Sequence, residues 1–145
     1  METPQSTSKK PKLNLDFKDS KYATGRRKRS IAKVWVKKGS GNIHVNGLKM
    51  NEYFKRPVHQ LIVTRPLDVI NGSNEYDVKC NVKGGGLTGQ VGAMVHGISK
   101  ALLQFDSSFK ATLKKEKLTT RDSRAVERKK YGHRKARRSF QFSKR

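Results

Sequence analysis

Residues 76–105 read YDVKCNVKGGGLTGQVGAMVHGISKALLQF, and this stretch decides the fold of the chain. Between Tyr76 and Val82 apolar and polar residues alternate strictly, which is the pattern of a strand with one buried face. From Gln90 to Phe105 apolar residues recur every three or four positions, which is typical of a helix with one apolar stripe. The stretch therefore predicts a strand, a glycine-rich crossover and the principal core helix.

This predicted helix also carries small residues that favour close packing. They are Gly92, Ala93, Gly97 and Ala101. Because small residues let two backbones approach each other, we expect the helix to pack closely on the sheet.

Upstream of this stretch the pattern favours short strands joined by turns. Alternation from Ser30 to Lys38 predicts a half-buried strand, and residues 43–45 predict a second, shorter one. The dipeptide that follows, Asn46-Gly47, is the strongest short signal for a hairpin. We expect these segments to form an antiparallel meander in a domain that begins near Tyr22.

Three further helices are expected outside the central stretch. Asn51 is a candidate cap for a short helix, and Pro57 suits the first turn of a second helix that ends at Pro66. After the core helix, Ser107 or Ser108 can cap another short helix. Together with the strands, these elements predict an α+β fold.

The charge is distributed very unevenly along the chain. The 145 residues carry 34 Lys and Arg against 11 Asp and Glu, a formal net charge of +23, and only 33% are hydrophobic. Residues 31–109 hold 10 basic and 5 acidic side chains, whereas residues 110–145 hold 15 and 3. Basic arms repel themselves and stay unfolded until a polyanion, RNA or DNA, neutralises them. We predict a disordered N-terminal extension (1–21), a globular α/β domain (22–118) and an extended basic C-terminal tail (119–145), with RNA or DNA as the partner.

Composition also excludes several classes of protein. The longest apolar cluster, residues 61–63, is far shorter than the roughly 18 to 20 residues of a membrane span, and we expect no membrane partner. Cys80 is the only cysteine, which forbids an intramolecular disulfide and favours a reducing compartment. The histidines lack paired ligand spacing, so we expect no metal and no cofactor. The first residues show neither a secretory nor an organelle-targeting pattern.

The glycine loop between the central strand and helix has two interpretations. Gly84, Gly86 and Gly89 match the dinucleotide-binding pattern G-x-G-x-x-G, and Asp106 lies where a ribose-binding acid is expected. A dinucleotide fold needs a parallel doubly wound sheet, however, and the expected meander does not fit it. We therefore expect no enzyme and no small-molecule substrate.

The second interpretation is a cradle for phosphates of a nucleic-acid backbone, because free N–H groups at a helix N-terminus bind anions. The residues of this predicted cradle are Lys83, Gly84, Gly85, Gly86 and Gln90. Alternatively, the glycines only let the turn pass close to the sheet, and both explanations can hold together.

Six motifs along the chain occur in a characteristic order and spacing. They are YATGRRKRSIA (22–32), IxVNG (43–47), VKGGGLTGQ (82–90), LTTRDSR (118–124), VERKKYG (126–132) and FQFSKR (140–145). In these motifs the chain resembles the ribosomal protein S-nine family of the small ribosomal subunit, in its bacterial form, over residues 22–145.

The resemblance implies a two-layer α/β domain like the second domain of ribosomal protein S-five. It also implies a structural role in translation, on ribosomal RNA in the subunit head and beside neighbouring ribosomal proteins. The C-terminal tail of the family runs toward the peptidyl site, where its end meets the anticodon stem-loop of the tRNA. Carried over to this chain, the tRNA-contacting residues are Ser143, Lys144 and Arg145.

Basic residues at the domain edges and along the C-terminal tail are then the further predicted contacts to ribosomal RNA. They are Arg26, Arg27, Lys28 and Arg29 just before the first strand, Arg121 and Arg124 where the tail starts, and Arg128, Lys129, Lys130, Arg134, Lys135, Arg137 and Arg138 along it. Such contacts neutralise phosphates whatever the base sequence, and released counterions drive them.

Two features depart from the commonest family pattern: the N-terminal extension, and Ser139-Phe140 where many members have a proline. The Ser-Phe form resembles alphaproteobacterial and mitochondrial members, which predicts a ribosome in the bacterial cytoplasm or the mitochondrial matrix. Composition alone equally permits a general nucleic-acid-binding protein, such as an RNA chaperone or a DNA-compacting factor. Only the ordered motifs separate these alternatives.

Overall fold

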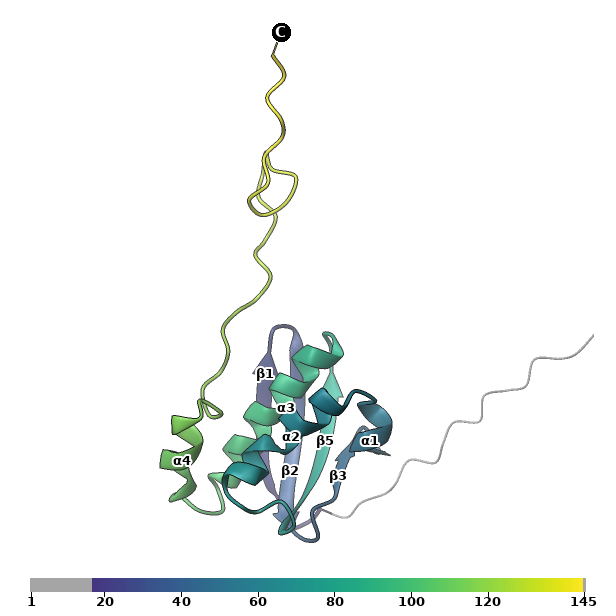
Figure 1. Cartoon of the computed structure of the whole chain (residues 1–145), viewed down its shortest axis with the longest axis vertical. Coiled ribbons are helices and arrows are strands. Elements are labelled where there is room, and N and C mark those ends of the chain that lie inside the picture. The colour runs from purple at the N-terminus through teal and green to yellow at the C-terminus, as the bar shows by residue number, and fades with distance from the viewer. Residues whose placement is uncertain (1–16, 145) are drawn as a thin grey trace, which may run out of the picture.

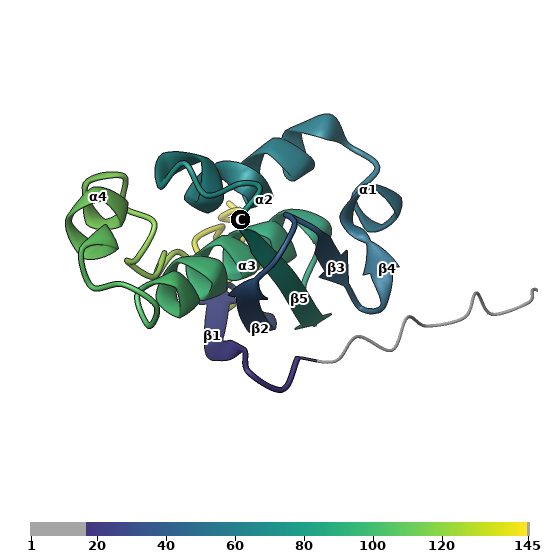
Figure 2. The ribbon, with the colours of Figure 1, turned by 90° about the horizontal axis from the view of Figure 1, so that it is seen from below.

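The computed structural model describes residues 17–144. In chain order its elements are β1 (Lys21–Arg27), β2 (Ser30–Lys38), β3 (Ile43–Val45), β4 (Leu48–Lys49), α1 (Met50–Tyr53), α2 (Pro57–Val69), β5 (Tyr76–Lys83), α3 (Leu87–Leu102) and α4 (Phe109–Lys115). The strands form one mixed sheet in the order β1-β2-β5-β3-β4, and α2 and α3 lie on one side of it (Figures 1 and 2). This confirms the predicted α+β fold. None of the helices described in residues 17–144 has the length and apolar character that crossing a membrane requires.

The central strand and helix form where the sequence predicts them. In β5, Val78 and Cys80 are fully buried between their exposed or half-buried neighbours. In α3 the predicted apolar stripe is buried, from Val91 through Ile98 to Leu102. The helix starts at Leu87, earlier than the apolar pattern indicates, because the loop glycines lead directly into its first turn.

The predicted antiparallel meander is wrong, although β2, β3 and the hairpin at Asn46-Gly47 are confirmed. The strand β5 lies between β2 and β3, pairs antiparallel with β2 and parallel with β3. The connection from β2 crosses the end of β5, where the Asn42 carbonyl accepts a hydrogen bond of 2.8 Å from the Val78 N–H. A short alternating segment does not specify its partner strand, so its pairing depends on this tertiary contact.

The edge strand β1 was not predicted, because glycine and arginines hide its alternation. It pairs antiparallel with β2 and turns through Lys28 and Arg29. A Cβ atom at Gly25 would meet the carbonyl oxygen of Ala93 and the backbone of Gly97. The prediction that small residues bring α3 close to the sheet is thus confirmed, and the partner in this contact is β1.

Two helix boundaries differ from expectation. The helix α2 continues through Pro66 to Val69, because Val63 and Leu67 on either side of the proline are buried in the core. Proline at this position removes one backbone donor, and this loss is offset by apolar burial in the following turn. The first short helix starts at Met50 after Lys49, so Asn51 is not its cap.

The packed core extends beyond α4. Leu113 in α4 is fully buried, and Leu118 is 8% exposed. After Leu118 the C-terminal tail first passes β1, where Asp122 pairs with Arg27, and its later described residues then run away from the sheet (Figure 1). One loop interrupts this path, where His133 and Ser139 form an isolated bridge. The predicted N-terminal extension lies, up to residue 16, outside the described residues.

Candidate nucleic-acid interface

The fold brings the glycine loop against the basic β1–β2 turn. Both segments line a cavity of about 470 Å³, whose lining residues are Lys28, Arg29, Ser30, Gly85, Gly86, Leu87, Thr88, Gly89, Ala125 and Val126. The basic cluster predicted just before the first strand is placed differently: Arg26 and Arg27 belong to β1, and Lys28 and Arg29 form the turn. The β1–β2 turn therefore places two of the four cations, Lys28 and Arg29, beside the glycine loop.

The glycine loop touches this turn so closely that its first two glycines leave no room for side chains. Gly84 and Gly85 adopt left-handed φ angles of +75° and +62°. A Cβ atom at Gly84 would lie 2.7 Å from the carbonyl oxygen of Arg29, and one at Gly85 would meet the hydroxyl of Ser30. Gly86 differs, because a Cβ atom there would meet nothing within 4 Å.

The donors around the cavity are suited to an anion. Gly86 is the N-cap of α3, and within the described residues no capping side chain accepts a hydrogen bond from the first N–H groups of this helix. Because Gly86 and the first turn of α3 line the cavity, the positive end of the helix dipole faces it. Ser30 is 1% exposed, and within the described part of the chain its Oγ has no hydrogen-bond partner. None of the described residues that line this cavity is acidic. The arrangement therefore offers backbone and hydroxyl donors beside two cations.

Two residues of the predicted cradle have a different placement from the one expected. The side-chain amide of Gln90 donates to the Gly84 carbonyl at 3.2 Å, and its oxygen accepts from the Tyr53 hydroxyl at 2.9 Å. Gln90 thus holds the loop in shape. Lys83 is exposed at the end of β5, on the sheet face opposite to buried Val82.

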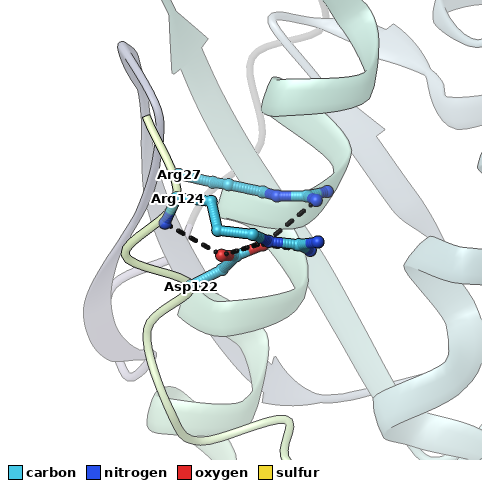
Figure 3. Close-up of polar contacts among 3 residues, drawn as sticks. All are labelled: Arg27, Asp122 and Arg124. Carbon is cyan, nitrogen blue, oxygen red and sulfur yellow. Dashed lines mark hydrogen bonds and ion pairs between the residues drawn. The ribbon is translucent and has the colours of Figure 1, made fainter. Parts of the chain in front are cut away.

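Arg27, Asp122 and Arg124 form a cluster of charged side chains, the Asp122 junction, that joins the start of the C-terminal tail to β1 (Figure 3). The carboxylate of Asp122 accepts from the Arg124 backbone N–H at 3.1 Å and pairs with the Arg124 guanidinium at 2.8 Å. It also pairs with Arg27 at 3.1 Å. These hydrogen bonds from Arg124, together with the nearby charges, hold the pKa of the Asp122 carboxyl well below its usual range.

The comparison with known families covers most of the chain. A family model described as Ribosomal protein S9/S16 matches residues 25–145, which include β2, the glycine loop and the whole C-terminal tail.

The chain belongs to the Ribosomal protein S9/S16 family.

It is therefore a structural protein of the small ribosomal subunit, it serves translation, and it is not an enzyme. Its G-x-G-x-x-G match does not mark a dinucleotide site, and the sheet around it is mixed. As an S9/S16 protein it works within an assembly of ribosomal RNA and ribosomal proteins.

In this S9/S16 protein the predicted cations of the C-terminal tail are all on the surface. The exposed ones are Arg121, Arg124, Arg128, Lys129, Lys130, Arg134, Lys135, Arg137 and Arg138. Glu127 pairs with Lys130 at 2.8 Å and with Arg137 at 2.9 Å, so it closes the loop of the tail. Of the predicted tRNA contacts, Ser143 and Lys144 are exposed, and Arg145 lies outside the described residues.

Sequence reasoning missed two residues at this candidate interface. Ser30 is the last residue of the basic motif GRRKRS, and its position after four cations was the available signal. Asp122 is the only acid among residues 117–126, and a lone acid in a basic segment indicates a specific partner. That partner, Arg27, becomes visible only in the folded domain.

Proposed function

We propose that this chain binds ribosomal RNA in the head of the small subunit and that the cavity between the glycine loop and the β1–β2 turn is its fixed phosphate site. The observation that supports this is the buried Ser30 hydroxyl, which lies beside Gly85 and Gly89 without a partner among the described residues. A backbone phosphate accepts hydrogen bonds from this hydroxyl and from the N–H groups of α3. Lys28 and Arg29 add charge at the same place.

The remaining predicted cations extend this contact along the RNA. Arg26 and Arg27 lie in β1, Lys83 at the end of β5, and the other cations follow the C-terminal tail. They neutralise phosphates without reading bases, and the release of counterions supplies most of the binding free energy. Phosphate contacts of this kind set the position of a protein on RNA.

We further propose the three-part organisation of the chain, with an N-terminal extension (1–21), a globular domain (22–118) like the second domain of ribosomal protein S-five, and an extended C-terminal tail (119–145). The end of the tail contacts the backbone of the anticodon stem-loop of peptidyl-site tRNA through Ser143, Lys144 and Arg145. Because the Ser139-Phe140 form resembles alphaproteobacterial and mitochondrial members, we propose the bacterial cytoplasm or the mitochondrial matrix as the compartment.

The experiment that tests the RNA-binding role compares subunits assembled with the wild-type chain and with the Lys28→Gln/Arg29→Gln variant. Quantitative mass spectrometry across a sucrose gradient then measures the chain in each fraction after a salt wash. We expect stoichiometric, salt-resistant recovery of the wild type with the small subunit and earlier salt release of the variant. A Lys114→Gln/Lys115→Gln variant on α4 is the control for charge alone. Equal release of all three chains contradicts the proposed site.

A further inference from the structure

Within residues 17–144, no helix covers the sheet face opposite α2 and α3. Figure 2 shows both helices on one side of the sheet and no helix of residues 17–144 on the other. Alternate residues of β1, β2 and β5 point to this face, because their neighbours are buried toward the helices. We call this surface the open face. It consists of the residues of β1, β2 and β5 whose side chains point away from the helices.

Aromatic side chains lie on β1 and β2 of this open face. Tyr22 of β1 is directly opposite Trp35 of β2, with ring centroids 5.2 Å apart and an angle of 42° between the rings. Tyr22 is 42% exposed, and Trp35 is partly exposed. A third ring, Phe17, lies under Lys37 at 4.8 Å from its ammonium nitrogen. Cross-strand aromatic pairs stabilise a sheet, but an exposed pair also offers flat rings to a ligand.

The charges around these rings are almost all positive. Lys33 lies opposite Asn81 in the register of β2 and β5, and Lys83 lies opposite Ile31. The only acid that the described strands place on this face is Asp77. Its carboxylate accepts hydrogen bonds from the Asn42 N–H at 2.9 Å and the Ser40 N–H at 3.0 Å, so it is engaged in the loop after β2. The open face thus has the charge complementary to a polyanion.

We propose that the open face binds an unpaired stretch of RNA, whose bases stack on Tyr22 and Trp35 and whose phosphates contact Lys33 and Lys83. Sheets that present aromatic rings between cations bind single strands in this way, because every base has a flat face to stack. An acidic protein surface would use the lysines alone and leave the rings without a specific role. This inference rests on the proposed RNA-binding function and adds a second kind of contact, in which bases take part.

The single tryptophan of the chain makes the proposal directly measurable. A short oligouridylate is titrated into the full-length protein while two signals are followed: Trp35 fluorescence, which reports stacking, and the anisotropy of a label on the RNA, which reports binding anywhere. Inorganic polyphosphate and polyglutamate are the comparison ligands. We expect oligouridylate to quench Trp35, whereas polyphosphate and polyglutamate bind the basic chain without quenching it.

Variants then assign the signal to the open face. We expect Trp35→Leu to weaken oligouridylate binding about tenfold in anisotropy, since stacking on aromatic rings contributes strongly to single-strand affinity. We expect Lys33→Gln to lower the log–log salt slope by about 0.7, with Lys114→Gln on α4 as its control for a lost charge on another surface. Trp35→Leu removes a partly exposed side chain, and its fold is checked by circular dichroism.

The outcomes separate this proposal from the proposed function. If anisotropy shows binding but Trp35 fluorescence is unchanged, RNA binding stands and stacking on the open face is wrong. Equal quenching by polyphosphate also overturns stacking, because that ligand has no bases. Quenching by polyglutamate alone assigns the face to an acidic protein partner. If neither signal responds to oligouridylate, both proposals fail.

Discussion

At the scale of single residues, the most informative side chain is Ser30. A buried hydroxyl without a hydrogen bond costs about 1–3 kcal/mol of folding free energy. Alanine would fill nearly the same volume as serine at this position. The hydroxyl nevertheless lies between Gly85 and Gly89, at the N-terminus of α3. The free protein can retain this unpaired hydroxyl, despite its cost in folding free energy, if the hydroxyl donates a hydrogen bond to an anion in the complex.

We therefore predict opposite effects of Ser30→Ala on stability and on binding. The free energy of unfolding should rise by about 1 kcal/mol, because the unsatisfied group is removed, whereas affinity for ribosomal RNA should fall. Urea denaturation and RNA titration of the same preparation measure the two quantities. A variant that loses stability and keeps its affinity shows that Ser30 has only a structural role.

At the scale of elements, β1 is held to the domain by contacts that its own sequence does not reveal. On one side it pairs with β2, and on the other Gly25 lies against the backbone of α3. The tail joins it through Asp122, which pairs with Arg27. The strand thus connects the sheet, the core helix and the tail.

The close contact between β1 and α3 should leave no room for a side chain at Gly25. We expect Gly25→Ser to lower the free energy of unfolding by about 1–3 kcal/mol or more, because the new atoms meet the backbone of Ala93 and Gly97. The same substitution at Gly86 is the matched control, since its side chain enters open space and can cap α3. Urea denaturation compares the two variants, and equal losses would contradict the contact.

The Asp122 junction should control the mobility of the tail. We predict that Asp122→Asn increases the rate of tryptic cleavage after Arg121 and Arg124, because the charge that pairs with Arg27 is lost. Glu127→Gln is the control, since among residues 17–144 the ion-pair partners of Glu127 are Lys130 and Arg137, both inside the tail.

The pH dependence of this junction follows from the depressed pKa of Asp122. The contacts with Arg124 and Arg27 favour the ionised carboxylate and so lower its pKa. The pair is therefore present at neutral pH and is lost only as the pH falls through the lowered pKa. The wild-type junction should therefore persist at a pH where ordinary aspartates are protonated. Paramagnetic relaxation from a spin label in the tail measures this, and release at the usual aspartate pKa would contradict it.

At the scale of the whole molecule, the domain and the C-terminal tail differ in how much of their surface is buried. The domain buries one core between the sheet and its helices, and the described part of the tail buries almost nothing. A long exposed segment with many cations gains its order from a polyanion and not from apolar packing.

We predict that deleting Lys144 and Arg145 leaves subunit assembly intact and speeds tRNA dissociation from the peptidyl site. Each lost phosphate contact should lower the log–log salt slope of tRNA binding by about 0.7 to 0.9. The control removes two charges from α4, as Lys110→Gln/Lys114→Gln. Filter binding on purified subunits measures dissociation, and identical rates in deletion and wild type would refute the tRNA contact.

Cys80 should report the unfolding of the domain as a unit. It is fully buried in β5, and burial raises the pKa of its thiol. Since the thiolate is the reactive form, we expect no reaction with a thiol reagent until the domain unfolds. Its labelling in urea should follow the same transition as Trp35 fluorescence. Rapid labelling in native buffer would show that β5 opens locally.

Much of the framework could be predicted because it depends on local patterns. Alternation over Ser30–Lys38 and Tyr76–Lys83 and the apolar stripe of α3 were confirmed, since a period of two or of about 3.6 is set by which side chains face the core. The family could also be recognised, because its motifs are short runs of consecutive residues that can be read directly from the sequence. The predicted RNA and tRNA contacts stay predictions.

Other features depend on contacts between distant segments, and no local period encodes them. The meander failed because β5 inserts between β2 and β3, and β1 was missed because its packing depends on Gly25 meeting α3. Thus the sequence by itself determined the main elements, the basic arms and the family. Only the tertiary structure decided which strands pair, that Ser30 lies at the glycine loop and that Asp122 pairs with Arg27, because burial and charge pairing act across space and not along the chain.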